Sequence, residues 1–299
     1  MINKIKEAVL DMQSKVEFSD DGHTYQVKSS GEWLQGVSTV SSIVPKGWLS
    51  AWGAKEAVKF LGYSDYPEDT KRAEEVLGIT RNMFAEDYIK FLKEAKGAAF
   101  RKSKEALVDG KAGHKWLEDY VSMRIKLKTS TYTPLLPEGN LKRPIEQFLK
   151  WEAENIKEWI LCESLVAYPE KGYAGTLDGV ALLNNGRYAV IDFKFASHIS
   201  EDYYLQTAGY QACFEPYGIK IDDRIIIRLP KTLLIEERDK KTHTYSKVGN
   251  NIEPEGTAER KIKMPQLKNM SDTELYELDR DNFYNALPLK KWINLMTKK

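Results

Sequence analysis

Cysteine is scarce in this chain. Only two of its 299 residues are cysteine, Cys162 and Cys213, and no Cys-x-x-Cys pair occurs. A zinc knuckle, a four-cysteine iron–sulfur cluster and a disulfide framework all require more cysteine, or cysteine in close pairs. The sequence therefore predicts a protein of a reducing compartment without an iron–sulfur cluster, in which other side chains hold any cofactor.

Long hydrophobic runs are absent as well. No apolar stretch approaches the roughly 20 residues needed to span a bilayer, and the N-terminal MINKIKEAVLDMQSK is charged throughout, without the apolar core of a signal peptide. Neither sign of charge is in excess, since 45 basic residues face 44 acidic ones. These features predict a protein with no membrane partner, and they confine any phosphate-binding surface to a local basic patch.

Hydrophobic periodicity separates the chain into helical and extended segments. Helical periods occupy residues 48–62, 81–128 (with a break near Gly97), 142–160, 201–215 and 271–297. Extended periods occupy residues 16–37, 163–168, 174–183, 187–195 and 224–236, with a Pro-rich connector at 134–137 and a polar excursion or mobile loop at 239–266. Helices around a strand cluster predict an α/β fold with a small central mixed sheet. We expect a single domain, with an N-terminal strand and helical region (1–98) before the core (99–236).

The most informative stretch is residues 175–195, which contains the pattern Asp-x-Lys at Asp192 and Lys194. The same pattern occurs at Asp69, Asp109 and Asp239, but only Asp192 ends an apolar strand. A period of two places Asp192 and Lys194 on one face of that strand and large apolar residues (Ile191, Phe193 and Phe195) on the other. The polar face is then either a solvent face or an active-site face.

The turn at residues 184–186 decides which residue faces Asp192. As a three-residue loop it pairs Leu183 with Arg187 and sets Asp178 opposite Asp192. A two-residue turn instead shifts the register by one and sends the two carboxylates to opposite faces. In the first register the like charges repel, and one or two bound Mg²⁺ or Mn²⁺ ions would offset that repulsion. The alternative is a solvated hairpin with an Asp–Lys pair.

The chemistry of such a hairpin follows from its charges. An ion held by Asp178 and Asp192 would polarise a phosphoryl oxygen and lower the pKa of a bound water. Lys194, on the same face, would stabilise charge in the transition state or orient the attacking water. Glu163, on the preceding strand, is either a further metal ligand or an exposed carboxylate.

Two helices carry further candidate residues. Gln206 and Tyr210 are spaced i,i+4, so they either donate hydrogen bonds to phosphate or water together or belong to a partly buried helix. His114 lies on a stripe that would face the core, together with Phe100, Leu107, Gly110, Leu117 and Val121. Gly110 and Gly113 each cost a helix about 1 kcal/mol, which indicates that another group approaches closely there. His114 is therefore either a metal ligand or a core residue.

Taken in order, these elements resemble the RecB-like branch of the PD-(D/E)XK nuclease superfamily. That branch carries G-x-x-x-H on a helix, G-x-x-D and D-x-K on two strands, and Q-x-x-x-Y on the next helix. The matching residues are Gly110 and His114, Gly175 and Asp178, Asp192 and Lys194, and Gln206 and Tyr210. The resemblance covers residues 110–230, and residues 36–58 are more loosely similar to phage-encoded exonucleases and the mitochondrial genome maintenance exonuclease. Leu177 stands where the superfamily name has proline.

The resemblance implies a restriction-endonuclease-like core and a DNA exonuclease that uses Mg²⁺ or Mn²⁺ on single- or double-stranded ends. The metal ligands that it implies are His114, Asp178, Asp192 and the main-chain carbonyl of Phe193. Lys194 would be catalytic, and Gln206 and Tyr210 would support the site or contact DNA. A bacterial or phage-infected cytoplasm and a partner in recombination or replication fit the same branch. Two alternatives stay open: a restriction-type or structure-specific endonuclease, and a non-catalytic nucleic-acid-binding module of this fold.

Two basic clusters are candidate tracks for DNA phosphates, or else ordinary solvated faces. The first cluster precedes His114 and consists of Lys90, Lys93, Lys96, Arg101, Lys102 and Lys104. The second lies in the polar excursion and consists of Lys240, Lys241, Lys247, Arg260, Lys261 and Lys263.

Overall fold

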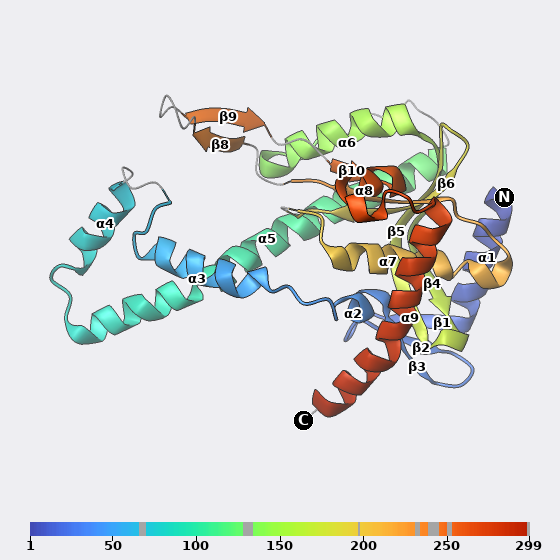
Figure 1. The fold of residues 1–299 in the computed structure, drawn as a ribbon, viewed down its shortest axis with the longest axis horizontal. Coiled ribbons are helices and arrows are strands. Elements are labelled where there is room, and N and C mark those ends of the chain that lie inside the picture. Colours follow the sequence, from blue (N-terminus) through green and yellow to red (C-terminus); the bar gives the residue numbers. More distant parts are fainter. Residues whose placement is uncertain are drawn as a thin grey trace. The chain divides into compact units, whose positions relative to one another are not determined.

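The structure is a computed structural model of the whole chain that describes residues 1–65, 70–127, 134–196, 198–230, 234–238, 245–249 and 253–297 (Figure 1). For residues 234–238 and 245–249 only the backbone is described. The chain divides into two compact units, residues 1–44 with 112–299, and residues 45–111. Helix α5 (Ala85–Leu127) contributes its last part to the larger unit and the rest to the smaller one.

In the described part of the larger unit, a mixed sheet of eight strands forms the centre. Its strands are β1 (Val16–Ser19), β2 (Thr24–Val27), β3 (Trp33–Gly36), β4 (Ile156–Tyr168), β5 (Tyr173–Leu183), β6 (Tyr188–Lys194), β7 (Asp223–Arg228) and β10 (Glu253–Glu255). The order is β1-β2-β3-β5-β6-β7-β10, with β4 paired to β5. The β3–β5 and β6–β7 pairs are parallel. An α/β fold with a mixed sheet is thus confirmed, although the sheet is larger than the sequence predicts.

Strand β5 is the branch point of this sheet. On one edge β5 pairs with β4 along its whole length. On the other edge, residues 173–174 pair with β3 and residues 179–182 pair with β6. Between those pairs the described ladders give residues 175–178 no strand partner on that edge. Asp178 lies at the end of this gap, where β6 begins to diverge from β5.

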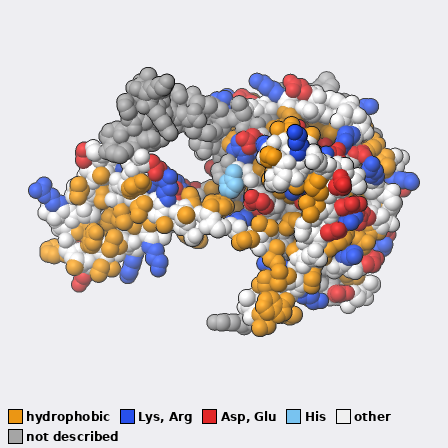
Figure 2. All heavy atoms as spheres, in the orientation of Figure 1, with side chains coloured by type: hydrophobic (Ala, Val, Ile, Leu, Met, Phe, Trp, Pro, Cys, Tyr) orange, Lys and Arg blue, Asp and Glu red, His pale blue; other side chains and the backbone are white. Residues whose placement is uncertain are grey.

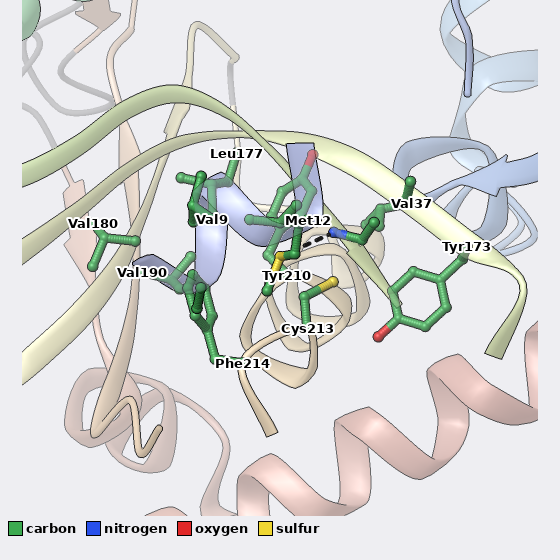
Figure 3. Close-up of a cluster of buried hydrophobic side chains, with 14 of the residues drawn as sticks. Val9, Met12, Val37, Tyr173, Leu177, Val180, Val190, Tyr210, Cys213 and Phe214 are labelled. Carbon is green, nitrogen blue, oxygen red and sulfur yellow. Dashed lines mark hydrogen bonds between the residues drawn. The ribbon is translucent and has the colours of Figure 1, made fainter. Parts of the chain in front are cut away.

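Helices cover both faces of the sheet (Figure 1). One face carries α1 (Ile2–Lys15), α2 (Val37–Ser41), α7 (Glu201–Ala212) and α9 (Asp272–Thr297), and the other carries α6 (Lys142–Asn155) and the last part of α5. Successive strand residues alternate between the two cores. Val180 and Val190 belong to the first core (Figure 3), whereas Ala181 and Ile191 belong to the second. The sheet is therefore the middle layer of a three-layer arrangement.

The N-terminal helix α1 shows how a charged segment packs against the sheet. Its buried residues recur on one stripe: Ile5, Ala8, Val9 and Met12. Val9 and Met12 join the cluster that contains Leu177 and Tyr210 (Figure 3). Burial of each large side chain contributes about 1.5–3 kcal/mol, so α1 is a fixed part of the larger unit. Within the described part of the chain, no helix has the length and apolar composition of a transmembrane segment.

The smaller unit consists of helices. They are α3 (Trp48–Phe60), α4 (Lys71–Thr80) and the first part of α5. Phe60 packs against Phe91 at a ring-centroid distance of 5.3 Å, and the Arg101 guanidinium lies 5.5 Å from the centre of the Phe60 ring. Gly62 follows α3 with a φ of 101°, a left-handed conformation that glycine adopts without strain. The predicted helix over residues 48–62 and its glycine stop are confirmed.

The predicted apolar stripe on α5 is only half right. Leu117 and Val121 are fully buried, but Phe100 and Leu107 are 74% and 58% exposed. In the smaller unit α5 packs through the side that carries Phe91. At about 100° per residue, Phe100 lies on the opposite side of the helix from Phe91. The stripe faces the core only where α5 belongs to the larger unit.

Several predicted boundaries are wrong. Helix α5 continues through Gly97 without a break. The helix predicted for residues 142–160 ends at Asn155, and residues 156–160 begin β4. Apolar residues at this junction fit either period, so spacing alone does not separate the two elements. The strand predicted for residues 224–236 ends at Arg228, just before Pro230, since proline cannot continue the hydrogen-bonded ladder.

The predicted polar excursion contains ordered elements. A two-stranded sheet of β8 (Leu234–Arg238) and β9 (Tyr245–Gly249) precedes β10, which pairs antiparallel with β7. Helix α8 (Thr257–Lys263) follows, and the Glu259 carboxylate accepts the Gly256 N–H at its start. Residues 239–244 and 250–252 lie outside the described residues. Polar composition concealed α8 because charged side chains of that helix hold it in place.

Candidate metal centre

The β5–β6 hairpin has the three-residue loop, one of the two turns that the sequence leaves open. Gly186 adopts a φ of 83°, and a 2.9 Å hydrogen bond joins the two residues that flank the loop. The ladder then runs to the pair of Gly179 with Ile191. The next step of the same register sets Asp178 opposite Asp192. The register that brings the two carboxylates together is confirmed, and the two-residue turn is excluded.

Asp178 holds the hairpin at the point where the strands diverge. Its Oδ2 accepts the main-chain N–H of Phe193 at 2.6 Å, so the carboxylate takes the place of a strand partner. Only 14% of the side chain is exposed. Burial raises the pKa of Asp178, and the charge of Lys194 and the hydrogen bond from Phe193 act in the opposite direction.

Asp192 is fully buried and forms an ion pair with Lys194. Lys194 Nζ donates to Oδ1 at 2.9 Å and lies 2.7 Å from Oδ2, so the ammonium group contacts both carboxylate oxygens. Burial, together with the charge of Asp178, raises the pKa of Asp192 to about 6. Burial alone would lower the pKa of Lys194, but the charges of Asp192 and Asp178 outweigh it and raise that pKa. The alternative interpretation, a solvated hairpin with an exposed Asp–Lys pair, is therefore wrong, because the pair is buried.

His114, Glu163 and Asp178 come together from α5, β4 and β5. Each offers one ligand atom, and these atoms all lie within 4.8 Å of one another. His114 Nδ1 lies 3.9 Å from Asp178 Oδ2, and the imidazole packs edge-on against Phe195 at a centroid distance of 5.4 Å. With 36% of its side chain exposed, His114 is not a buried core residue.

The backbone at Glu163 is specialised. The pairs of Cys162 with Gly179 and Ser164 with Leu177 place Glu163 directly across from Asp178. Glu163 has a φ of 41°, a left-handed conformation that is uncommon outside glycine. The Ser164 hydroxyl spans this kink by donating to the Cys162 carbonyl at 2.9 Å. The kink keeps the carboxylate of Glu163 beside that of Asp178.

The carboxyl group of Glu163 is a strong proton acceptor in this setting. Glu163 is exposed on one side, as the alternative of an exposed strand carboxylate expects. Burial of its other side raises its pKa to about 8, and the neighbouring charges of Asp178 and Glu118 act in the same direction. Glu118, which sequence reasoning missed, lies one turn after His114 on α5. Crowded carboxylates that resist ionisation become favourable ligands once a cation neutralises them.

A pH dependence of metal binding follows from these values. Protons compete with a cation for the carboxylates, so apparent Mn²⁺ affinity should rise by up to about tenfold per pH unit until pH 8, the pKa of Glu163, and then level off. In the unfolded chain this pKa returns to about 4.3. The metal-free fold therefore gains stability from the bound proton at low pH and loses it as pH rises through 8.

Titration of Mn²⁺ by electron paramagnetic resonance at a series of pH values measures this dependence. The matched variant Glu163→Gln should bind Mn²⁺ more weakly and with a shallower pH slope. Equal pH slopes of Mn²⁺ affinity in the parent and the variant would show that Glu163 is not a metal ligand.

The donor set fits a hard or borderline divalent cation. One imidazole nitrogen and two carboxylates lie within reach of a single ion, and the buried Asp192 carboxylate, paired with Lys194, interacts electrostatically with Asp178 and His114. No thiolate belongs to this group, which favours Mg²⁺ or Mn²⁺ over a cysteine-bound zinc site. His114, Glu163 and Asp178 are the residues that would hold the ion, with Asp192 as a further candidate ligand.

A scan of the sequence against protein-family models finds no match. A search of curated proteins finds none either. The function is therefore inferred from the side chains themselves and their geometry.

Gln206 and Tyr210 form a supporting pair behind the carboxylates. Gln206 Nε2 donates to the Tyr210 hydroxyl at 3.0 Å, and Tyr210 is 4% exposed. A Cβ atom at Gly175 would lie 2.7 Å from the Tyr210 ring, so the glycine of G-x-x-D makes room for this tyrosine. Burial, with the charges of Asp192 and Asp178, raises the pKa of Tyr210. The hydroxyl thus stays protonated beneath the site.

The sequence predicts that another group approaches α5 closely beside His114, and that group is the ring of Phe195. A Cβ atom at Gly113 would lie 2.3 Å from that ring. Gly113 therefore lets α5 rest on the end of β6 and places His114 over the hairpin. The glycine serves packing within the protein rather than contact with a ligand.

Tyr203 is a functional candidate that sequence reasoning missed. Lys194 Nζ lies 5.0 Å from the centre of its ring, within the range of a cation–π interaction. The signal was present, because Tyr203 precedes Gln206 by three residues and shares its face of α7. Tyr203 is a positioning residue for the lysine.

If this site is the nuclease centre that the resemblance implies, removal of the Tyr203 ring should lower the cleavage rate by about 2- to 30-fold, since cation–π interactions contribute about 0.5–2 kcal/mol. Tyr203→Leu should also shift the alkaline limb of the pH–rate profile downward, because the ring stabilises the charged lysine. Tyr203→Phe keeps the ring and is the matched control. An equal loss in both variants would assign the effect to the hydroxyl group instead.

Six of the twelve residues in the two basic clusters form ion pairs in the described part of the chain. Three residues of the first cluster bind acids of their own unit: Lys90 to Asp87, Arg101 to Glu94 and Lys102 to Glu56. Three residues of the second hold α8 in place: Arg260 on Asp279, Lys261 on Asp272 and Lys263 on Glu255. Lys240, Lys241 and the side chain of Lys247 lie outside the described residues. The described part of the second cluster is thus structural.

Proposed function

We propose that this protein is a metal-dependent DNA nuclease with the core of the RecB-like branch of the PD-(D/E)XK superfamily. The observation that carries the proposal is the hairpin register, which joins Asp178, Asp192 and Lys194. His114 and Glu163 meet Asp178 from two other elements. The four motifs also lie on α5, β5, β6 and α7 in that order, which is the arrangement the resemblance implies.

The side chains have distinct tasks in this proposal. A bound Mg²⁺ or Mn²⁺ supplies Lewis acidity toward a phosphoryl oxygen and lowers the pKa of a water molecule. His114, Glu163 and Asp178 hold the ion, with Asp192 and the Phe193 carbonyl as further candidate ligands. Lys194 keeps its proton and lies beside Asp192, where it can bind a phosphate oxygen or orient the attacking water.

The surrounding residues keep this lysine in place. Tyr203 lies against the Lys194 ammonium group, and Asp192 binds it directly. Tyr210 supports the carboxylates from behind and is too enclosed to contact DNA, and the half-buried Gln206 donates to it. We assign DNA strand ends as the substrate, in the cytoplasm of a bacterium or phage-infected cell, with a recombination or replication protein as partner.

The mode of cleavage can be measured directly. End-labelled single- and double-stranded linear DNA is incubated with Mg²⁺ or Mn²⁺, beside covalently closed circular DNA. An exonuclease degrades the linear substrates and leaves the circle intact, whereas an endonuclease cuts the circle. Tight binding without cleavage in any metal would support the non-catalytic module and overturn the proposal.

Replacement of His114 distinguishes between two roles for this residue, a metal ligand and a packing residue. His114→Ala should weaken apparent metal affinity by about 10- to 100-fold, with partial recovery of cleavage at raised Mn²⁺. The melting temperature should change little, because the side chain is 36% exposed. Loss of stability with unchanged metal dependence would assign His114 to packing alone.

A further inference from the structure

The last turns of α9 present an apolar stripe to solvent. The stripe consists of Leu289, Trp292, Leu295 and Met296, which are 48%, 58%, 68% and 70% exposed. Trp33 of β3, 64% exposed, shares a groove of about 810 Å³ with Leu295. Figure 1 shows the end of α9 running out beyond the sheet, and Figure 2 shows hydrophobic side chains gathered on this projection. The stripe has no role in the metal centre.

This stripe is distinct from the face by which α9 packs on its own unit. Leu275, Phe283 and Leu287 are buried and attach the helix to the core. Leu289, Trp292 and Met296 follow at spacings of three and four residues, so they form a second stripe on the outer side. This spacing matches the seam through which one helix packs against another. A helix with two apolar faces has a place for a second helix.

The charges point to the same kind of partner. Lys290 Nζ donates to the Ser42 hydroxyl at 3.1 Å, and the exposed Lys291 lines the groove beside Leu295. The four stripe residues themselves are uncharged, so the stripe offers no ion pair to an acidic peptide or a phosphate. An uncharged helical seam is self-complementary, which is what a two-fold pair of identical chains requires.

The area is sufficient for a stable pair. With roughly 150–250 Å² for a large side chain, the exposed parts of the four α9 residues (48–70% exposed) add up to on the order of 450 Å². A standard interface buries about 800 Å² on each partner, a little over half of it apolar. We propose that a second copy of this chain docks on the stripe, with the two α9 helices antiparallel and Trp292 near the two-fold axis.

Sedimentation of the full-length protein over a range of concentrations tests this pairing. The parent should form a dimer, and Trp292→Glu should be monomeric with an unchanged circular dichroism spectrum. Leu10→Glu is the matched control, since Leu10 is 64% exposed on α1, and it should remain dimeric. A parent that stays monomeric, or a dimeric Trp292→Glu variant, would overturn the proposal. Binding of a monomeric parent to phosphatidylglycerol vesicles would assign the stripe to a lipid surface instead.

The antiparallel arrangement has its own test. In this arrangement position 289 of one copy faces position 296 of the other. A mixture of Leu289→Cys and Met296→Cys proteins should therefore form the mixed disulfide in excess over either homodimer. Burial raises the pKa values of both natural thiols, Cys162 and Cys213. Disulfide formation in the parent protein provides the background for the comparison. Predominant homodisulfides would contradict the antiparallel seam. Neither experiment depends on the proposed nuclease activity.

Discussion

Asp178→Asn is expected to lower metal-dependent DNA cleavage by about 10³-fold, or about 4 kcal/mol of transition-state stabilisation, while the melting temperature holds or rises. Asparagine keeps an oxygen that can accept the Phe193 N–H. It also removes a buried charge whose pKa is raised by burial, so the metal-free fold loses a source of repulsion. Cleavage assays and thermal unfolding in EDTA measure the two effects separately.

Asp192→Asn should lose as much activity but behave differently in stability. Asp192 is the ion-pair partner of Lys194, and its replacement by asparagine leaves the lysine with only the more distant charge of Asp178. Breaking such a pair costs about 3–5 kcal/mol, so this variant should melt at a lower temperature than the parent. Equal stability of the two variants would contradict the described ion pair, and full activity of either would remove that carboxylate from the site.

Lys194→Met is expected to reduce cleavage by about 10²- to 10³-fold without loss of metal binding. The ammonium group lies at the carboxylates but is not a ligand, so its removal makes the site more negative. Affinity for Mn²⁺ should therefore hold or increase while the rate falls. The absence of Lys194 should also raise the pKa of Asp192 further, because Lys194 opposes the effect of burial.

The control for this variant is Lys220→Met, which removes a lysine whose side chain is 78% exposed. It should cleave DNA like the parent. If Lys194→Met lost metal binding and cleavage together, the lysine would be a structural element of the cation site and would have no separate role in the reaction.

Local sequence signals predicted the hairpin and the motif residues on it. The turn ending at Gly186 has only a few geometries, and one of them sets Asp178 opposite Asp192. Strand periodicity then assigned Asp192 and Lys194 to a common face. These inferences involve residues close in sequence, so turn chemistry and periodicity are sufficient for them.

Proximity between distant elements was harder to predict. The meeting of His114 with Glu163 depends on how α5 rests on Phe195 and on a left-handed backbone at Glu163, and spacing encodes neither. Charge runs were ambiguous for a similar reason. Arg260 and Lys263 looked like solvated or DNA-binding residues, but their acidic partners come from α9 and β10.

The most direct test of the central claim is the rate of cleavage of end-labelled linear DNA by the parent protein as a function of Mg²⁺ or Mn²⁺ concentration. A metal centre at His114, Glu163, Asp178 and Asp192 predicts saturable activation by the cation, complete loss in EDTA and recovery when excess cation is added. Cleavage that continues in EDTA, or no cleavage at any concentration of either cation, would contradict a metal-dependent nuclease.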